Sequence, residues 1–144
     1  MIRQIPYPCI CFLFFSFVIL FATSNKLIAE TSLQATTWKW SFLVETEPAT
    51  QSVVPQPENY TLAFTEDGAL KIKADCNMAQ GTYSVEGKKL SIVLGPTTMA
   101  ACGDQSLDIM YLGLLGRVGS YAFNDDKLIL NLQEGKGQMT FNKH

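Results

Sequence analysis

The sequence predicts a mainly β (α+β) fold in which one small, strongly curved antiparallel sheet carries a single packed helix. Most of the chain after residue 30 consists of short segments rich in β-branched and aromatic residues, separated by turn pairs. Only the segment that begins at Ser106 has apolar residues at helical spacing. A domain of about 115 residues is large enough for one hydrophobic core of its own.

The first 29 residues have the pattern of a secretory signal peptide. Arg3 gives a positive start, and residues 10–22 form an uncharged apolar run. Thirteen helical residues rise about 20 Å, which is short of a hydrocarbon core of ~30 Å. Small residues predict cleavage near residue 24 or residue 29. We therefore expect a secreted or periplasmic protein; an uncleaved membrane anchor is the alternative, which the short run disfavours.

The expected mature chain, residues 30–144, forms a single mildly acidic domain. Cleavage removes Arg3 and Lys26, which changes the net charge from −2 to −4. Cys9 and Cys11 do not follow the small-residue tripeptide of a lipoprotein signal, so we expect no lipid anchor after cleavage. An acidic domain has no electrostatic footprint for nucleic acid. We expect a monomer whose partner is a protein or a small apolar ligand.

The strands are expected in the following order. Residues 36–45 alternate as a first strand, and the proline-bearing segment 47–59 is expected to be a loop with a short edge segment at Val53–Val54. Three hairpins follow, each with its own turn residues. They join 60–64 to 69–74 around Asp67-Gly68, 81–85 to 89–95 around Gly87, and 120–123 to 127–132 around 124–126, before a final strand at 138–141.

The one predicted helix lies between the second and third hairpins. Ser106 is expected to cap its start, and Gly119 is expected to end it in the left-handed conformation. Gly113 and Gly116 each weaken it by up to ~1 kcal/mol. We expect their missing side chains to let the helix lie close to the sheet. Its apolar face is formed by Leu107, Met110, Tyr111, Leu114, Leu115 and Val118.

The residue types present argue against an enzyme, a cofactor or a metal site. The only histidine is His144, the final residue, where a proton acceptor cannot be held in position for Ser-His-Asp or Cys-His chemistry. Two distant cysteines without histidines do not form a zinc site. The pair Asp125-Asp126 fits a solvated turn better than a calcium loop.

Cys76 and Cys102 either form a disulfide with each other, or Cys76 is a free reactive thiol. The disulfide is favoured because the expected compartment is oxidising. The adjacent Asp75 and Asn77 would not lower the pKa of a Cys76 thiol. Closing a loop of about 25 residues would stabilise the fold by ~3.5 kcal/mol.

Aromatic residues are the remaining candidates for a site. Trp38 and Trp40 lie two residues apart and share one face of a strand. They form either a stacking platform for a ligand or part of the core, and the core is favoured because aromatic side chains dominate protein interiors. The sequon at Asn59 would matter only in a host that glycosylates secreted proteins.

Residues 67–102, DGALKIKADCNMAQGTYSVEGKKLSIVLGPTTMAAC, resemble the signature of the META domain family, which includes the heat-inducible HslJ-like proteins of bacteria. In that signature a strand ends in Cys-Asn, Gly-x-Tyr and a short hairpin follow, and a threonine precedes a cysteine by four residues. The resemblance extends from about Trp38 to Phe141. The matching positions are Asp75, Cys76, Asn77, Gly81, Tyr83, Thr98 and Cys102.

The resemblance implies a small lipocalin-like barrel with one helix, located in the cell envelope or secreted. The family has no established enzymatic activity, and its members are linked to heat or envelope stress, antibiotic resistance and parasite virulence. The matching residues therefore carry over as signature positions and not as catalytic ones. Many members have a lipoprotein signal, which this sequence lacks, so we expect a soluble form.

Three functions are compatible with the sequence. The first is a non-catalytic secreted or periplasmic module that maintains the envelope under stress by binding a protein or ligand. The second is a barrel for a small apolar ligand, with Trp38, Trp40, Tyr83 or Phe123 lining the cavity. The third is an inhibitor of a secreted hydrolase that presents the loop 47–59.

Overall fold

The structure is a computed structural model that describes residues 32–144. The predicted signal peptide and its cleavage positions lie outside these residues. Within the described part of the chain, no helix is long and apolar enough to cross a membrane.

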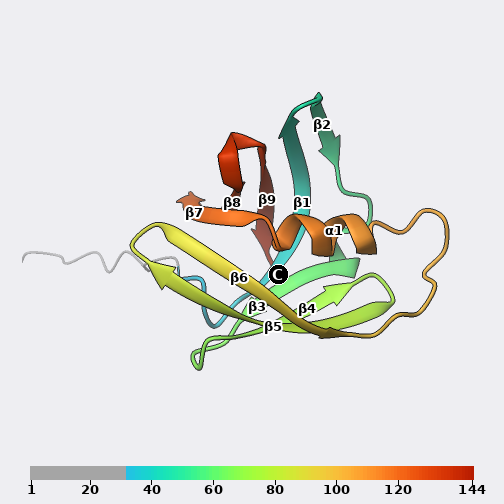
Figure 1. Cartoon of the computed structure of the whole chain (residues 1–144), viewed down its shortest axis with the longest axis horizontal. Coiled ribbons are helices and arrows are strands. Elements are labelled where there is room, and N and C mark those ends of the chain that lie inside the picture. The colour runs from blue at the N-terminus through green and yellow to red at the C-terminus, as the bar shows by residue number, and fades with distance from the viewer. Residues whose placement is uncertain (1–31) are drawn as a thin grey trace, which may run out of the picture.

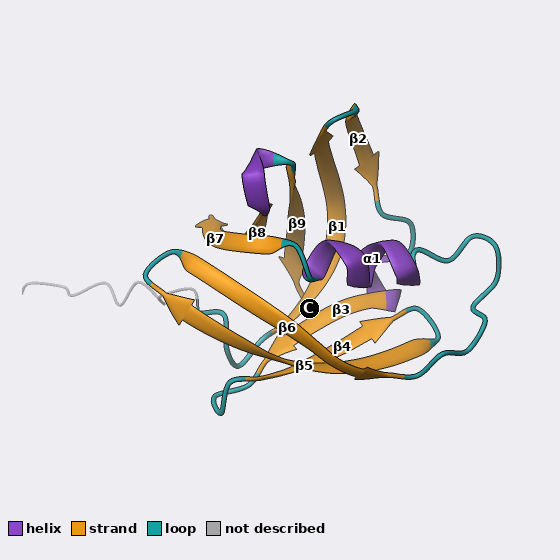
Figure 2. Ribbon diagram, viewed as in Figure 1, coloured by secondary structure: helices purple, strands orange, loops and turns teal. Residues whose placement is uncertain are grey.

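Nine antiparallel strands, counted over residues 32–144, form a single curved sheet that closes into a ring without being a regular barrel (Figures 1 and 2). Pairing of β1 with β9 closes the ring, and the weakest joint is β6–β7, where Lys89 pairs with Ser120. The predicted fold class is confirmed. The strands are β1 Thr37–Thr46, β2 Ala49–Val53, β3 Tyr60–Phe64, β4 Ala69–Ala74, β5 Asn77–Glu86, β6 Lys89–Thr97, β7 Val118–Asn124, β8 Lys127–Leu132 and β9 Gly137–Lys143.

The segment 47–59 differs from the predicted loop. Its residues 49–53 form β2, which pairs with β1 from Thr46↔Ala49 to Phe42↔Val53. The prolines at 48 and 55 flank this stretch, and the six residues between them each keep a backbone N–H that can donate to a neighbouring strand. Proline therefore bounds the strand instead of preventing it. The expected edge segment at Val53–Val54 was too short and placed too late in the chain.

The ring is filled by side chains that alternate inward from the strands. On β1 the inward positions are Trp38, Trp40 and then Leu43, because a bulge between Trp40 and Phe42 shifts the alternation by one residue. Both indoles are completely buried and belong to the core. Trp38 Nε1 donates to the Leu33 carbonyl at 3.0 Å, and Trp40 Nε1 donates to the Phe42 carbonyl at 3.1 Å.

Helix α1, Asp108–Leu115, packs across the ring next to β4 and β6, and its side chains reach β1 and β3 (Figure 1). Tyr111 is its anchor, with its ring stacked on Trp40 at 5.1 Å between centroids and edge-on to Tyr60 at 5.7 Å. Leu114 and Leu115 are buried on the same side. An aromatic cluster that joins α1 to two strands therefore fixes the helix position.

The predicted helix limits were wrong at both ends. The N-cap residue is Leu107, although the Ser106 hydroxyl accepts a hydrogen bond from the Asp108 amide at 3.2 Å. The helix stops at Gly116 because Val118 already pairs with Leu132 in β7.

The expected roles of Met110 and of the glycines were also wrong. Met110 is exposed and lies outside the buried face of α1. A Cβ on Gly113 would meet nothing within 4 Å, and one on Gly116 would make only ordinary contacts. The helix therefore does not use these glycines to approach the sheet. Gly119 lies in β7 and does not adopt a left-handed conformation.

Candidate functional site

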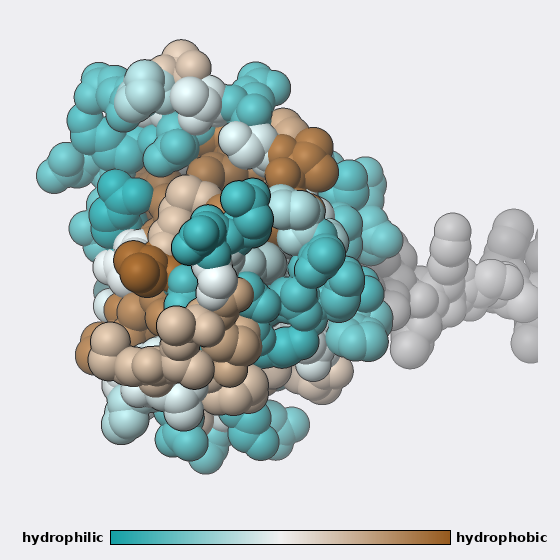
Figure 3. Space-filling view, turned by 90° about the vertical axis from the view of Figure 1, so that its right-hand side faces the viewer, coloured by the Kyte–Doolittle hydropathy of each residue, from teal (hydrophilic) through white to brown (hydrophobic). Residues whose placement is uncertain are grey.

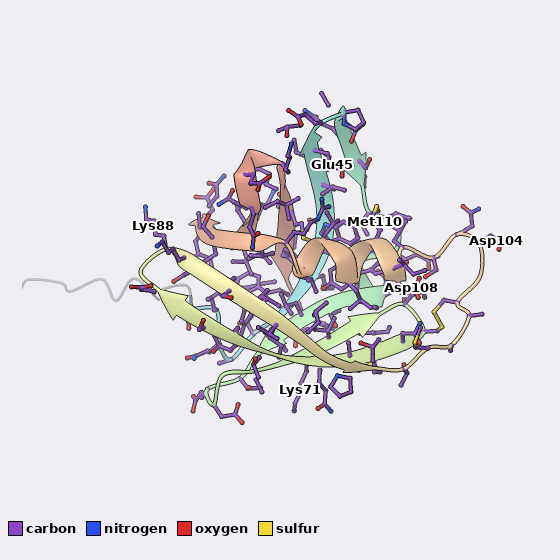
Figure 4. All side chains as sticks on the ribbon, in the orientation of Figure 1. Glu45, Lys71, Lys88, Asp104, Asp108 and Met110 are labelled. Atoms are coloured by element: carbon purple, nitrogen blue, oxygen red, sulfur yellow. A yellow bond between two sulfur atoms is a disulfide. The ribbon has the colours of Figure 1, made fainter. Side chains whose placement is uncertain are left out.

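The turn between β4 and β5 carries the first signature residues. Asp75 adopts the left-handed conformation with φ of 57°, and its amide donates to the Asn59 carbonyl at 2.7 Å. The turn presents Cys76 at the corner of the sheet. Cys76 is bonded to Cys102, with their Cα atoms 5.5 Å apart. The disulfide ties the β4–β5 turn to the loop between β6 and α1 (Figure 4).

Asn77 is the one buried polar residue in residues 32–144, with 3% of its surface exposed. Its Oδ1 accepts hydrogen bonds from the Thr98 hydroxyl at 3.0 Å and the Ala100 amide at 2.8 Å. Its Nδ2 lies 3.0 Å from the Ala100 carbonyl and 2.9 Å from Asp108 Oδ2. A single side-chain amide thus joins the start of β5 to the loop and to the start of α1.

Thr98 completes this arrangement by pairing with Met78. The Met78 amide donates to Thr98 Oγ1 at 2.9 Å, and the Thr98 amide donates to the Met78 carbonyl at 3.0 Å. We call the set Cys76, Asn77, Thr98, Cys102 and Asp108 the Asn77 clamp.

Gly81 and Tyr83 hold β5 in place farther along the strand. A Cβ on Gly81 would lie 2.7 Å from the Val93 carbonyl oxygen, so only glycine permits the close approach of β6 at the bulge after Ala79. The Tyr83 hydroxyl donates to the Thr65 carbonyl and accepts from Gln34 Nε2, both at 2.8 Å.

The signature residues are therefore brought together in two places, the Asn77 clamp and the middle of β5. The polar side-chain groups of Asn77, Tyr83 and Thr98 are engaged by other groups of the same chain, and this arrangement holds the fold. Sequence reasoning missed Asp108 as a member of the clamp. The only available signal was an acidic residue in the first turn of the predicted helix.

The clamp keeps a negative charge at the start of α1. Burial raises the pKa of Asp108, but hydrogen bonds from the Ile109 amide, Asn77 and Ser106 outweigh this effect, and the pKa lies below its ordinary value. Asp108 is therefore ionised at neutral pH. Burial also raises the pKa of Tyr111 well above its usual value, and its hydroxyl has no hydrogen-bond partner in the described structure.

An apolar groove of about 420 Å³ lies between α1 and the loop of residues 98–107 that precedes it, and we call it the clamp groove. Met99 and Ile109 stand on its walls with 94% and 84% of their surfaces exposed. Figure 3 looks onto this side of the molecule and shows apolar side chains gathered toward the lower left of the face. The residues that line the groove include Leu94, Met99, Ala100, Asp108, Ile109 and Leu112.

A second hollow, of about 430 Å³, is aromatic and lies near residue 32. Tyr83 and Phe123 line it together with Val85 and Tyr121. Trp38 lies behind it, with its ring centroid 5.9 Å from that of Phe123. Of the four aromatic residues considered from the sequence, Tyr83 and Phe123 thus line a surface pocket, and Trp38 and Trp40 fill the interior.

Solved structures with low sequence identity share the fold. A protein from Burkholderia xenovorans, determined by NMR, is 24% identical with a TM-score of 0.62, over 78% of this chain and 83% of that one. A DUF4847 family protein from Bacteroides vulgatus is 12% identical with a TM-score of 0.59, over 76% and 93%. These identities establish similarity of fold alone.

A comparison with curated proteins found no match. The family model described as META domain matches residues 31–144, which include every signature position and both pockets. The chain therefore belongs to the META domain family.

Proposed function

We propose that this META domain is a non-catalytic secreted or periplasmic module that maintains the cell envelope under stress by binding a protein. The observation that carries the proposal is the use of Asn77. Both polar atoms of its side chain bond to neighbours in the chain, so the signature residues build a rigid framework. Binding is then a property of the exposed surface that this framework holds in place.

Two features support the location. The N-terminal sequence has the pattern of a cleaved signal peptide, and Cys76 and Cys102 are joined in a bond that persists in oxidising compartments. The exposed apolar clamp groove supports binding, because contiguous apolar surface marks interaction sites.

Deletion of the gene in its native host tests the proposal. The deleted strain should survive heat and envelope-active antibiotics less well than its parent, and a plasmid copy of the gene should restore survival. The matched control is a plasmid whose product lacks residues 1–29 and so stays in the cytoplasm. Parental survival of the deleted strain under all of these challenges would remove the proposal.

Binding of a small apolar ligand is a second candidate because Tyr83, Tyr121 and Phe123 line an aromatic pocket. Native mass spectrometry of protein purified from its host should then show an added mass, which the Phe123→Ala variant loses. Protein that carries no added mass, and that gains none when incubated with a host lipid extract, would exclude this candidate.

A further inference from the structure

We propose that the clamp groove binds a short segment of a partner protein in which an apolar side chain stands next to a lysine or arginine. This inference rests on the proposed function and deepens it, because it names the binding surface and the chemistry of the partner.

The apolar part of the argument is the concentration of exposed side chains around the groove. Met99 and Ile109 line it. Met78 lies in the adjoining hollow, which shares Thr97 and Thr98 with the groove. Single exposed apolar residues are ordinary, but Met99 and Ile109 on the groove, with Met78 in the hollow beside it, form a group of the kind found on interaction surfaces. Methionine side chains are flexible and polarisable, and they adapt to apolar partners of different shapes.

The charge of the groove selects the partner. Asp108, the first residue of α1, lies on its wall, and Asp104 is exposed on the loop that precedes α1 (Figure 4). The Asp108 carboxylate accepts hydrogen bonds from the neutral groups of Asn77 and Ser106. Among the described residues, no lysine or arginine lines the groove or forms an ion pair with Asp108 or Asp104. A cation on the partner would supply the missing opposite charge.

The same charges disfavour an anionic membrane surface, since Asp104 and Asp108 would repel acidic headgroups. They also disfavour an acidic apolar segment. The groove is bounded by a loop on one side and by α1 on the other, and its volume suits side chains rather than a whole domain. A basic, apolar protein segment is the occupant that satisfies both the shape and the charge.

Methyl NMR of the folded domain tests this inference. The protein is labelled with ¹³C at the methionine methyl groups and titrated with acetyl-Ser-Lys-Leu-Phe-Lys-Ser-amide. A twin peptide carries glutamate in place of each lysine. The Met99 resonance should shift and saturate with the basic peptide, and the acidic twin should bind about tenfold more weakly. Met139, which is completely buried, is the internal control and should not shift.

Variants separate the apolar and charged contributions. Met99→Ser/Ile109→Ser should abolish saturable binding, whereas Val53→Ser, a matched change of an exposed apolar residue on β2, should leave it intact. Asp108→Asn should reduce the difference in affinity between the basic peptide and its acidic twin. Asp104→Asn, at an exposed side chain, should reduce it less and without any change in stability. Thermal unfolding of each variant establishes that it is folded.

Several results would overturn the inference. These are equal affinity for the two peptides, absence of any saturable shift, and shifts in Met139 as large as those in Met99. Methionine shifts that depend on protein concentration without peptide would identify a second copy as the occupant. Shifts caused by phosphatidylglycerol vesicles would identify a membrane. None of these results bears on the survival of the deleted strain, so failure here and failure of the proposed stress function remain distinguishable.

Discussion

Removal of the Cys76–Cys102 disulfide should destabilise the domain strongly. The two cysteines are separated by 26 positions, and a loop of that length contributes ~3.5 kcal/mol in the chain-entropy description. An unfolding entropy of ~2.1 cal/mol/K per residue over residues 32–144 amounts to ~0.24 kcal/mol/K. The expected decrease in Tm is therefore about 15 °C, and more than 10 °C in any case. Loosening of the Asn77 clamp adds to this loss and does not offset it.

Circular dichroism melting of the purified domain with and without reductant measures this effect. The Cys76→Ala/Cys102→Ala variant should melt like the reduced wild type, and reductant should not change its Tm. A decrease in Tm of less than about 5 °C would refute the reasoning. Rapid labelling of Cys76 by a maleimide in unreduced, folded protein would also refute it and would restore the reactive-thiol alternative.

Three further predictions concern the clamp and the core. Asn77→Ala should lower the free energy of unfolding by about 3 kcal/mol in urea titrations, because it removes the hydrogen bonds that the buried Asn77 amide makes to Thr98, Ala100 and Asp108; a loss below ~1 kcal/mol would contradict the clamp. Tyr111→Phe removes an unpaired buried hydroxyl, so calorimetry should show a free energy of unfolding that is unchanged or up to ~1 kcal/mol higher. A free energy of unfolding lowered by more than ~1 kcal/mol would show that the hydroxyl has a hydrogen-bond partner. Because the folded pKa of Asp108 is lowered, its carboxylate stabilises the fold above its unfolded pKa of ~3.9 and loses this effect as pH falls through the folded value. Urea titrations at several acidic pH values should show this decline in wild type and a shallower one in Asp108→Asn; equal slopes would contradict it.

The fold class could be predicted because local signals agree along most of the chain. Turn pairs such as Asp67-Gly68 mark the hairpins, and alternating apolar residues mark the inward face. The two cysteines in the expected mature chain allowed one disulfide. The bulge in β1 was not predictable, because the extra residue is determined by pairing with β9, a hundred positions later in the sequence.

The site was less accessible to sequence reasoning than the fold. Helical spacing continues through Val118, but pairing of that residue with β8 ends the helix earlier, so tertiary structure overrides local preference. The Asn77 clamp brings Cys76 and Asn77, Thr98 and Cys102, and Asp108 together from the start of β5, the loop after β6 and α1, and no spacing rule predicts this. The clamp groove is formed by that meeting and has no signature of its own.

Survival of the deleted strain that carries groove variants is the measurement that tests the central claim most directly. Plasmids encode the wild type, Val53→Ser or Met99→Ser/Ile109→Ser, and cells are challenged with heat and envelope-active antibiotics. We predict that the wild type and Val53→Ser restore survival, and that the double variant does not, although it is folded and present at the same level. Full restoration by the double variant would contradict the claim that this META domain acts through its clamp groove.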